Sequence, residues 1–291
     1  MEIVYVFEQV LNGLLIGAFY LLIALGLSLI FSLGGIVNLA HGAFFALGAY
    51  LTVALAPTIG FGGAFVVSPV LVGLLGLLVE RVLLRRFYRG DPILGLLLTF
   101  GLAMVAEQGF RMTWGAAPVP FSIPMALRGQ VIIGELIFSR YRLLILLVAA
   151  IAVLGLWLLL TRTAFGRVVR AGVQNPDMVA ALGISLKPYM SAVVAIAVGL
   201  AALAGVMSAP ITGVHPAMGA EILTFAFVVV VIGGLGSFWG VVAAAFIVGV
   251  VRGLAAYYVP SATEASVYLL MVLVLLLRPR GLFGERIQKF E

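Results

Sequence analysis

Long, continuously apolar runs follow one another along nearly the whole chain, and this feature limits the possible folds more than any other. A helix of about 20 apolar residues crosses the roughly 30 Å hydrocarbon layer of a bilayer. The strands of a membrane barrel are half as long and alternate in polarity, which these runs do not. Because 64% of the 291 residues are hydrophobic and only 10% are charged, lipid must solvate much of the surface. We therefore expect an all-α, polytopic integral membrane bundle.

The apolar runs predict about eight or nine transmembrane helices, at least one of them short or broken. We expect residues 1–291 to form a single transmembrane domain. An extracytoplasmic loop is expected at 111–141 and a cytoplasmic loop at 161–188. The predicted spans are 10–31, 36–56, 60–79, 93–110, 143–160 and 190–210, and the block 223–277 divides into three further crossings.

Basic residues gather in three segments between or after the spans, at 81–89, 162–187 and 278–289. Cytoplasmic loops carry an excess of Lys and Arg, so we place these three segments and the C-terminus in the cytoplasm. The acidic N-terminus is then extracytoplasmic, and it lacks the basic start of a removable signal peptide. The loop 111–141 also carries Arg, yet crossings on either side of it place it outside.

Several kinds of chemistry are excluded by what the chain lacks. Cysteine is absent, which removes disulfides, thiolate metal sites and Cys nucleophiles. His41 and His215 are the only histidines, too few for a metal site by themselves. No G-x-x-x-x-G-K-[ST] motif is present, and no serine stands in a nucleophile-elbow motif. We therefore expect no enzyme activity, no bound cofactor and no nucleic-acid partner.

Polar side chains within apolar runs, among them Asn38, His41 and Glu107, are costly unless they face protein or a cavity. Asn38 and His41 are three residues apart and would share one face of a helix. Two interpretations remain open for this pair, either packing against a neighbouring helix or bordering a translocation path. Glu107 lies near the end of its span, so it could reach the interface or face the same path.

Glycines inside the spans predict close approaches and breaks. The small-residue pairs Gly13/Gly17 and Gly249/Gly253 are typical of helix packing. The run 233–236 differs, because its three glycines disfavour a continuous helix. A broken helix beside a substrate and a plain turn between two spans are both open interpretations. The glycines concerned are Gly233, Gly234 and Gly236.

The loop 161–188 is basic and long enough for one or two short helices. Asn175-Pro176 is a helix-start signal, because Asn caps and Pro suits the first turn. Small residues would allow a close docking surface beside the apolar side chains that follow Pro176. This surface could lie on lipid or dock into a partner protein. The small residues are Ala180, Ala181 and Gly183, and the apolar ones are Met178, Val179, Leu182 and Ile184.

Three segments, at 26–51, 162–204 and 228–284, carry a resemblance over nearly the full length. Together their N-x-A-H-G, G-G-L-G-S and R-P-R-G-L-F motifs are specific. The chain resembles the permease subunits of branched-chain amino acid ABC importers, on the H-type side. Many members have an acid after A-H-G where this chain has Ala43, and the usual Glu before paired Ala is replaced here by Pro176-Asp177-Met178.

The resemblance implies a permease in a prokaryotic inner membrane, working by alternating access. Its partners would be two cytoplasmic ATPases that use the ATP, a second permease (M-type, or a second copy) and an extracytoplasmic binding protein. The solute would be a branched-chain or other neutral amino acid. Urea, an amide or another small polar solute is the alternative, and an ion-coupled secondary transporter is a further rival. The implied ATPase-coupling residues are Arg167, Asn175, Pro176, Ala180, Ala181 and Gly183, and the candidate path residues are Asn38, His41, Glu107, Gly233, Gly234 and Gly236.

Overall fold

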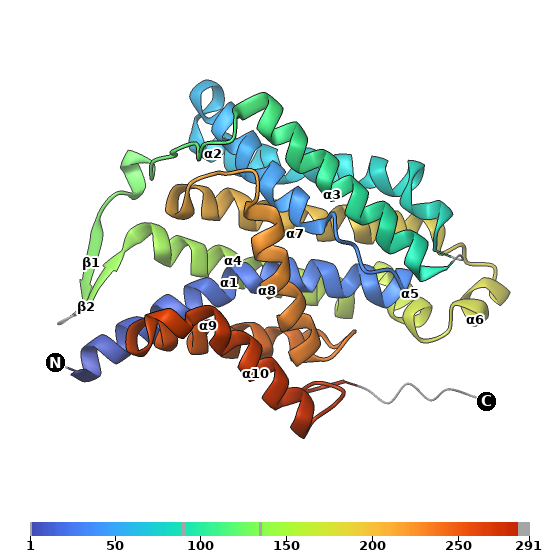
Figure 1. The fold of residues 1–291 in the computed structure, drawn as a ribbon. Coiled ribbons are helices and arrows are strands. Elements are labelled where there is room, and N and C mark those ends of the chain that lie inside the picture. The colour runs from blue at the N-terminus through green and yellow to red at the C-terminus, as the bar shows by residue number, and fades with distance from the viewer. Residues whose placement is uncertain (1, 89–90, 134–135, 285–291) are drawn as a thin grey trace.

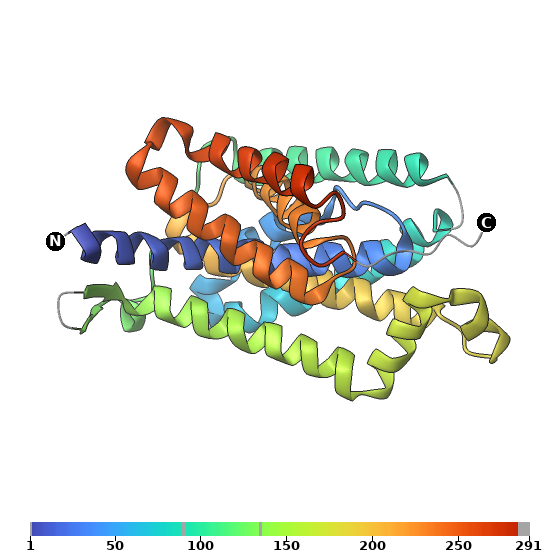
Figure 2. The ribbon, with the colours of Figure 1, turned by 90° about the horizontal axis from the view of Figure 1, so that it is seen from below.

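The apolar runs fold into long helices that lie roughly side by side (Figures 1 and 2). The computed structural model describes residues 2–88, 91–133 and 136–284. One two-stranded hairpin, β1 and β2, interrupts the helices between α3 and α4. The elements are α1 Glu2–Gly34, α2 His41–Val82, α3 Pro92–Trp114, β1 Gln130–Ile133, β2 Leu136–Ser139, α4 Arg140–Arg162, α5 Ala164–Gln174, α6 Pro176–Ala181, α7 Lys187–Thr212, α8 Met218–Gly233, α9 Phe238–Tyr258 and α10 Thr263–Leu277.

Among the described residues, seven helical segments are long and apolar enough to cross a membrane. One of them, α2, is two legs joined at Gly60, whose φ of 72° and ψ of 166° are not helical. Thr52 Oγ1 donates to Ser68 Oγ at 3.2 Å, whereas a straight helix would separate these residues by about 24 Å. The chain therefore folds back at Gly60. With the 16-residue α8 as a short helix, the predicted bundle of eight or nine helices is confirmed.

Glycine contacts hold the centre of the bundle together. A Cβ at Gly13 on α1 would lie 2.6 Å from the Gly249 carbonyl oxygen on α9, and one at Gly253 would lie 2.6 Å from the Gln9 carbonyl oxygen. The predicted close packing of these small-residue pairs is confirmed. On the other side, a Cβ at Gly48 of α2 would lie 2.5 Å from the Ala202 carbonyl oxygen of α7. Because α1 and α7 pack on both sides, they are the most buried of the long helices.

The predicted loop 111–141 is partly ordered as secondary structure. Helix α3 continues to Trp114 and α4 begins at Arg140, so the true connection is 115–139. It contains the antiparallel pair β1–β2, a small exception to the all-α expectation. Val119 also pairs with Val214 in the α7–α8 connection, which ties the two connections together.

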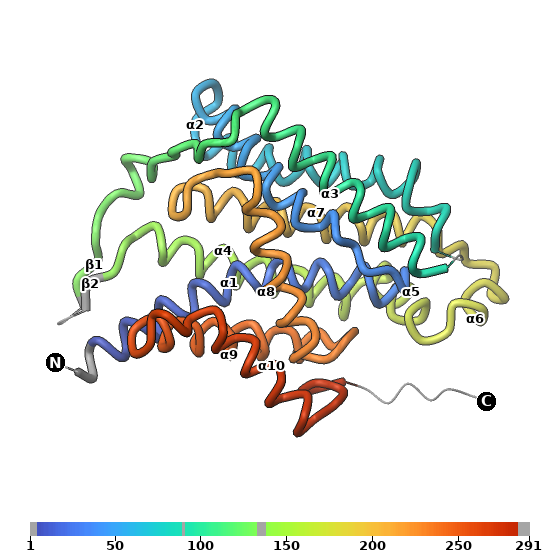
Figure 3. The backbone as a smooth tube through the Cα atoms, viewed as in Figure 1, coloured from blue at the N-terminus to red at the C-terminus, as the bar shows by residue number. Residues whose placement is uncertain are grey.

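The basic segments gather toward one end of the molecule. The turn at Leu84–Arg86, the helices α5 and α6, and residues 278–284 lie toward the end opposite the hairpin and the start of α1 (Figure 3). Arg89, Arg286 and Lys289 lie outside the described residues. The sequence predicts that these basic segments lie on one side of the membrane, and their described parts lie toward the same end of the molecule.

Candidate translocation and coupling sites

An irregular segment, residues 35–40, connects α1 to α2, and it is buried or half-buried from Ile36 onward. Gly35, with a φ of +64°, follows the last residue of α1. A Cβ at Gly26 would lie 2.8 Å from His41 Nε2, so the segment returns along α1 for about 12 Å. Thr99 of α3 accepts from Leu39 N at 3.1 Å and donates to the Val37 carbonyl at 3.3 Å. These bonds supply partners that buried irregular backbone needs in a bilayer.

Asn38 and His41 are both buried, but they do not share a helical face. The prediction that they do is wrong, because α1 ends at Gly34 and α2 begins only at His41. Asn38 lies in the irregular segment, where its Oδ1 accepts from Ala40 N at 3.0 Å. Its Nδ2 has no hydrogen-bond partner within the described residues. The His41 ring instead lies against Gly26 of α1, and neither of its ring nitrogens has a hydrogen-bond partner within the described residues, so both interpretations of His41 stay open.

Two hollows flank this segment, and they meet at Leu39, Leu223 and Thr224. The first, about 320 Å³, contains Asn38, and we name it the Asn38 hollow. The second, about 250 Å³, contains Glu107, and we name it the Glu107 hollow. Helix α8 supplies lining to both. The Asn38 hollow is otherwise lined by Leu27, Val37, Phe227, Val228, Tyr268 and Met271, and the Glu107 hollow by Ala43, Phe100, Ala103, Met104, Phe110, Pro216, Gly219 and Ala220.

Glu107 has a partner of opposite charge one helical turn away. Its Oε1 lies 2.7 Å from Arg111 Nη2, and about a third of its side chain is exposed. Ala43, where many family members were expected to carry an acid, lines the same hollow as Glu107. The fold therefore places one carboxylate in this hollow from α3, rather than from the start of α2.

The glycine run 233–236 is a turn between α8 and α9, not a break within one helix. Gly234 and Gly236 have φ values of +96° and +85°, which favour glycine. The R-P-R-G-L-F segment packs onto this turn, because Leu282 N donates to the Ile232 carbonyl at 2.7 Å. The G-G-L-G-S and R-P-R-G-L-F motifs, which are far apart in the sequence, therefore pack together in the structure. None of the three glycines lines the Asn38 hollow or the Glu107 hollow, and Gly236 lines a different cavity beside α5.

The loop 161–188 forms two short helices, as its length predicted. Asn175 caps α6, accepting from Met178 N at 2.9 Å, and Pro176 is its first residue. Phe165 of α5 stacks on Tyr189 of α7 with ring centroids 5.7 Å apart. Arg170 donates to the Leu160 carbonyl at the end of α4. The segment is therefore anchored to the two long helices on either side of it.

The tip of this segment is apolar and exposed. Within α6 and the turn that follows, Val179 is buried, whereas Met178 and Leu182 are 58% and 71% exposed. Ala180 and Ala181 are exposed as well, and α6 projects from the end of the bundle (Figure 1). Gly183 has a φ of +78°, so glycine is needed there for the backbone and not only to leave space.

Sequence reasoning missed a buried carboxylate, Glu80, near the end of α2. Ser191 Oγ of α7 donates to Glu80 Oε2 at 2.5 Å, and Arg85 Nη2 lies 3.3 Å from the same oxygen. Arg85 Nη2 also donates to Ser191 Oγ at 2.6 Å. Burial, with Glu80 nearby, raises the pKa of the Tyr88 phenol. The sequence did offer one signal, because Glu80 stands at the end of an apolar run, next to Arg81. Its partner Ser191 could not be identified from the sequence.

Comparison with known proteins decides the family. The family described as "Branched-chain amino acid transport system / permease component" matches residues 9–277. This chain belongs to that family. It is 28% identical to the high-affinity branched-chain amino acid transport system permease protein BraD of Pseudomonas aeruginosa, over 98% of this chain and 97% of BraD. Identity is 26% both to LivH of Escherichia coli, over 98% of this chain and 97% of LivH, and to a probable LivH of Methanocaldococcus jannaschii, over 98% and 95%.

The residues matched by the family include every segment of the candidate sites. The matched residues of this permease contain the irregular segment 35–40, the whole of 161–188 and the α8–α9 turn. The chain is thus a multi-pass membrane transport permease, whose full-length relatives are named as permeases and not as enzymes.

Proposed function

We propose that this chain is the transmembrane permease subunit of an ATP-driven importer for branched-chain or other neutral amino acids. The observation that carries the proposal is the family match over 9–277, together with relatives aligned over almost their whole length. ATP would be used by two cytoplasmic ATPase subunits, and an extracytoplasmic binding protein would deliver the solute. A second permease chain, M-type or another copy, would complete the path in a prokaryotic inner membrane.

The two hollows fit the chemistry of a small zwitterion with an apolar side chain. Asn38 lines one hollow with an amide whose buried Nδ2 has no hydrogen-bond partner among the described residues, and Glu107 offers an acceptor for an ammonium group in the other. The shared walls at Leu39 and Leu223 suit a branched aliphatic side chain. Urea or a simple amide could use the polar groups but would leave these apolar walls unused, which makes it the second candidate.

The segment 161–188 is proposed to be the contact with the ATPases. Its exposed apolar tip at α6 would dock on a partner, and its anchored base would carry movement into the bundle. Helix α7 follows directly, and Ser191 on α7 is hydrogen-bonded to Glu80 on α2. A displacement of the tip would therefore act on α7 and on the second leg of α2 together. The excess of basic residues at this end supports a cytoplasmic position for it and for the C-terminus.

Reconstitution tests the proposal directly. The chain is purified with the proteins that accompany it and placed in liposomes, and uptake of radiolabelled leucine is measured with the binding protein outside and ATP inside. We expect uptake that requires ATP and persists when an ionophore collapses ion gradients. Uptake that needs a gradient and no ATPase would establish the ion-coupled rival instead. Competition by isoleucine and valine, but not by urea, separates the two classes of solute.

Glu107 provides the sharper test of the path. Glu107→Gln keeps the shape and the hydrogen bond to Arg111 but removes the charge that would meet an ammonium group. We expect the KM for leucine uptake to rise about tenfold, which corresponds to about 1.4 kcal/mol. Glu264→Gln, an acid of α10 that lines neither hollow, is the matched control. An unchanged KM in Glu107→Gln would move the solute away from this hollow.

A further inference from the structure

A groove runs along α1 between α4 and α9, separate from both hollows described above. It consists of two cavities, of about 300 Å³ and 270 Å³, that share Trp157 and Trp239. Figure 2 shows α1 lying between α4 on one side and α9 on the other. Ala18 and Leu21 of α1 form the floor of one cavity, and Leu25 and other α1 residues form the floor of the next, so the two cavities continue one another along the helix.

The two parts of the groove differ in chemistry. The part deeper in the bundle is lined by apolar side chains, except for the indole N–H groups at its end. Its lining is Ala18, Leu21, Leu146, Ala149, Ala150, Val153, Leu154, Trp157, Trp239, Val242 and Phe246.

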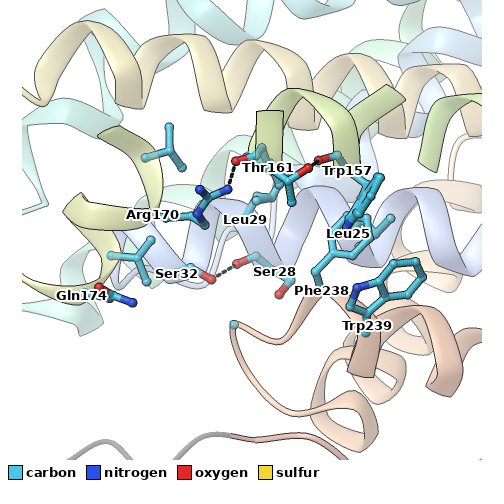
Figure 4. Close-up of a pocket in the computed structure, with 14 residues that line it drawn as sticks. Leu25, Ser28, Leu29, Ser32, Trp157, Thr161, Arg170, Gln174, Phe238 and Trp239 are labelled. Carbon is cyan, nitrogen blue, oxygen red and sulfur yellow. Dashed lines mark hydrogen bonds between the residues drawn. The ribbon is translucent and has the colours of Figure 1, made fainter. Parts of the chain in front are cut away.

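The part beside α5 contains polar and cationic groups. Ser28, Ser32, Thr161 and Gln174 line it together with Arg170 (Figure 4). Arg170 uses one guanidinium N–H on the Leu160 carbonyl and carries further donors on the same planar group. This end of the groove therefore has a positive charge and several hydrogen-bond donors.

The two indoles mark the boundary between these parts. Trp157 and Trp239 have ring centroids 6.3 Å apart, and both rings line both cavities. Tryptophan is enriched where the hydrocarbon layer meets the headgroups, because its ring is apolar and its N–H is polar. The order along the groove is thus apolar, interfacial and cationic, which is the order of chemistry along a phospholipid.

We propose that this groove binds one anionic phospholipid, with an acyl chain between α4 and α9 and the phosphate held by Arg170. Phosphate is recognised well by guanidinium, and basic pockets between transmembrane helices suit anionic headgroups. A free phosphate ion would leave the apolar part empty.

The position of Arg170 gives the lipid a role in assembly. Helix α5 lines the groove with Val169, Arg170, Val173 and Gln174, whereas most of the other lining residues belong to α1, α4 and α9. A bound lipid would therefore add to the contacts that already hold α5 against the end of α4. That the lipid belongs to the cytoplasmic leaflet rests on the proposed function, which sets the orientation. The binding itself depends only on the groove.

Native mass spectrometry of the full chain, purified in mild detergent and titrated with phosphatidylglycerol, tests the headgroup contact. We expect one tightly retained lipid, and about tenfold weaker retention in Arg170→Gln. Arg170→Lys should restore part of it. Arg162→Gln is the matched control, because Arg162 is exposed nearby and does not line the groove. Equal losses in Arg170→Gln and Arg162→Gln would show general charge attraction and overturn the assignment.

A second pair of variants tests the acyl-chain part. Ala150→Trp fills the groove from α4 and should abolish tight retention. Gly155→Trp places the same bulk on the opposite face of α4, where a Cβ meets no atom within 4 Å, and should leave retention unchanged. Equal retention in these two variants contradicts the proposal, as does tight binding of phosphatidylcholine or inorganic phosphate at the strength of phosphatidylglycerol. Since lipid retention is read without transport, failure here leaves the leucine-uptake result intact.

Discussion

Two segments of this permease leave regular helix between long spans, and they are held in opposite ways. Residues 35–40 are buried or half-buried from Ile36 onward, where Thr99 bonds to their backbone and Asn38 bonds to Ala40. Residues 161–188 lie at the end of the bundle, where the base is packed and the tip at α6 is exposed. Buried irregular backbone must find partners within the protein, whereas an exposed tip is free to keep an apolar surface for another protein. Changes in the first should therefore affect stability, and changes in the second should affect coupling.

Gly42→Val should have the largest effect on stability. A Cβ at Gly42 would lie 2.8 Å from the Gly219 carbonyl carbon, so α2 and α8 could no longer cross beside the irregular segment. We expect a loss on the order of 3 kcal/mol, or failure to accumulate. Thermal unfolding in detergent measures it. Gly101→Val, at a helical position with no atom within 4 Å, is the control and should change stability little. Equal unfolding temperatures for Gly42→Val and Gly101→Val would show that α2 and α8 do not cross closely at Gly42.

Glu80→Ala should come next, at the base of the second segment. It removes the acceptor of Ser191 and leaves Arg85 without its carboxylate. Breaking a buried pair costs about 3–5 kcal/mol, and the low end applies because Arg85 is one-third exposed. Glu107→Ala removes an exposed pair of similar spacing and should cost at most about 1 kcal/mol. If the two variants unfold alike, Glu80 does not fasten α7 to α2.

Thr99→Val should have an intermediate effect. It keeps the shape but removes the hydroxyl that bonds to Leu39 N and the Val37 carbonyl, at an expected cost of about 1–2 kcal/mol. Thr113→Val on the same helix loses bonds only to carbonyls of α3 and serves as the control. Hydrogen exchange of the Leu39 amide gives a second measurement. Exchange no faster than in the unmodified chain would mean that Thr99 does not hold the segment.

Ala181→Trp should have the smallest effect on stability and a large one on coupling. Ala181 is exposed at the tip, so stability should change by no more than about 0.5 kcal/mol. If the proposed ATPase contact is right, a bulky side chain there should clash with that partner and uncouple ATP hydrolysis from leucine uptake. Ala164→Trp, exposed at the base of α5, is the matched control. Gly183 is unsuitable for this test, since its φ of +78° would strain any substitution. Normal coupling in Ala181→Trp would place the contact elsewhere.

Local patterns predicted much of the fold because their physical cause is local. Apolar run lengths located the spans, and Asn175-Pro176 located the start of α6. The glycine pairs of α1 and α9 predicted close packing, since small residues permit it wherever the partner lies. The prediction that Asn38 and His41 share a helical face was wrong, because a spacing of three residues places side chains on one face only where the helix is continuous. The backbone leaves helix at Gly35, and the turn that follows places the two side chains on different neighbours.

The sequence by itself determined that this protein is a helical membrane permease, because apolar length and motif content need no knowledge of contacts. The tertiary structure alone decided which polar groups meet. Glu80 and Ser191 are 111 residues apart, and Glu107 and Ala43 come from different helices, yet each pair shares one site. No local sequence pattern predicts the groove between α4 and α9 either. Its walls come from helices far apart in the chain, and only their packing on α1 brings an apolar trough, two indoles and Arg170 into line.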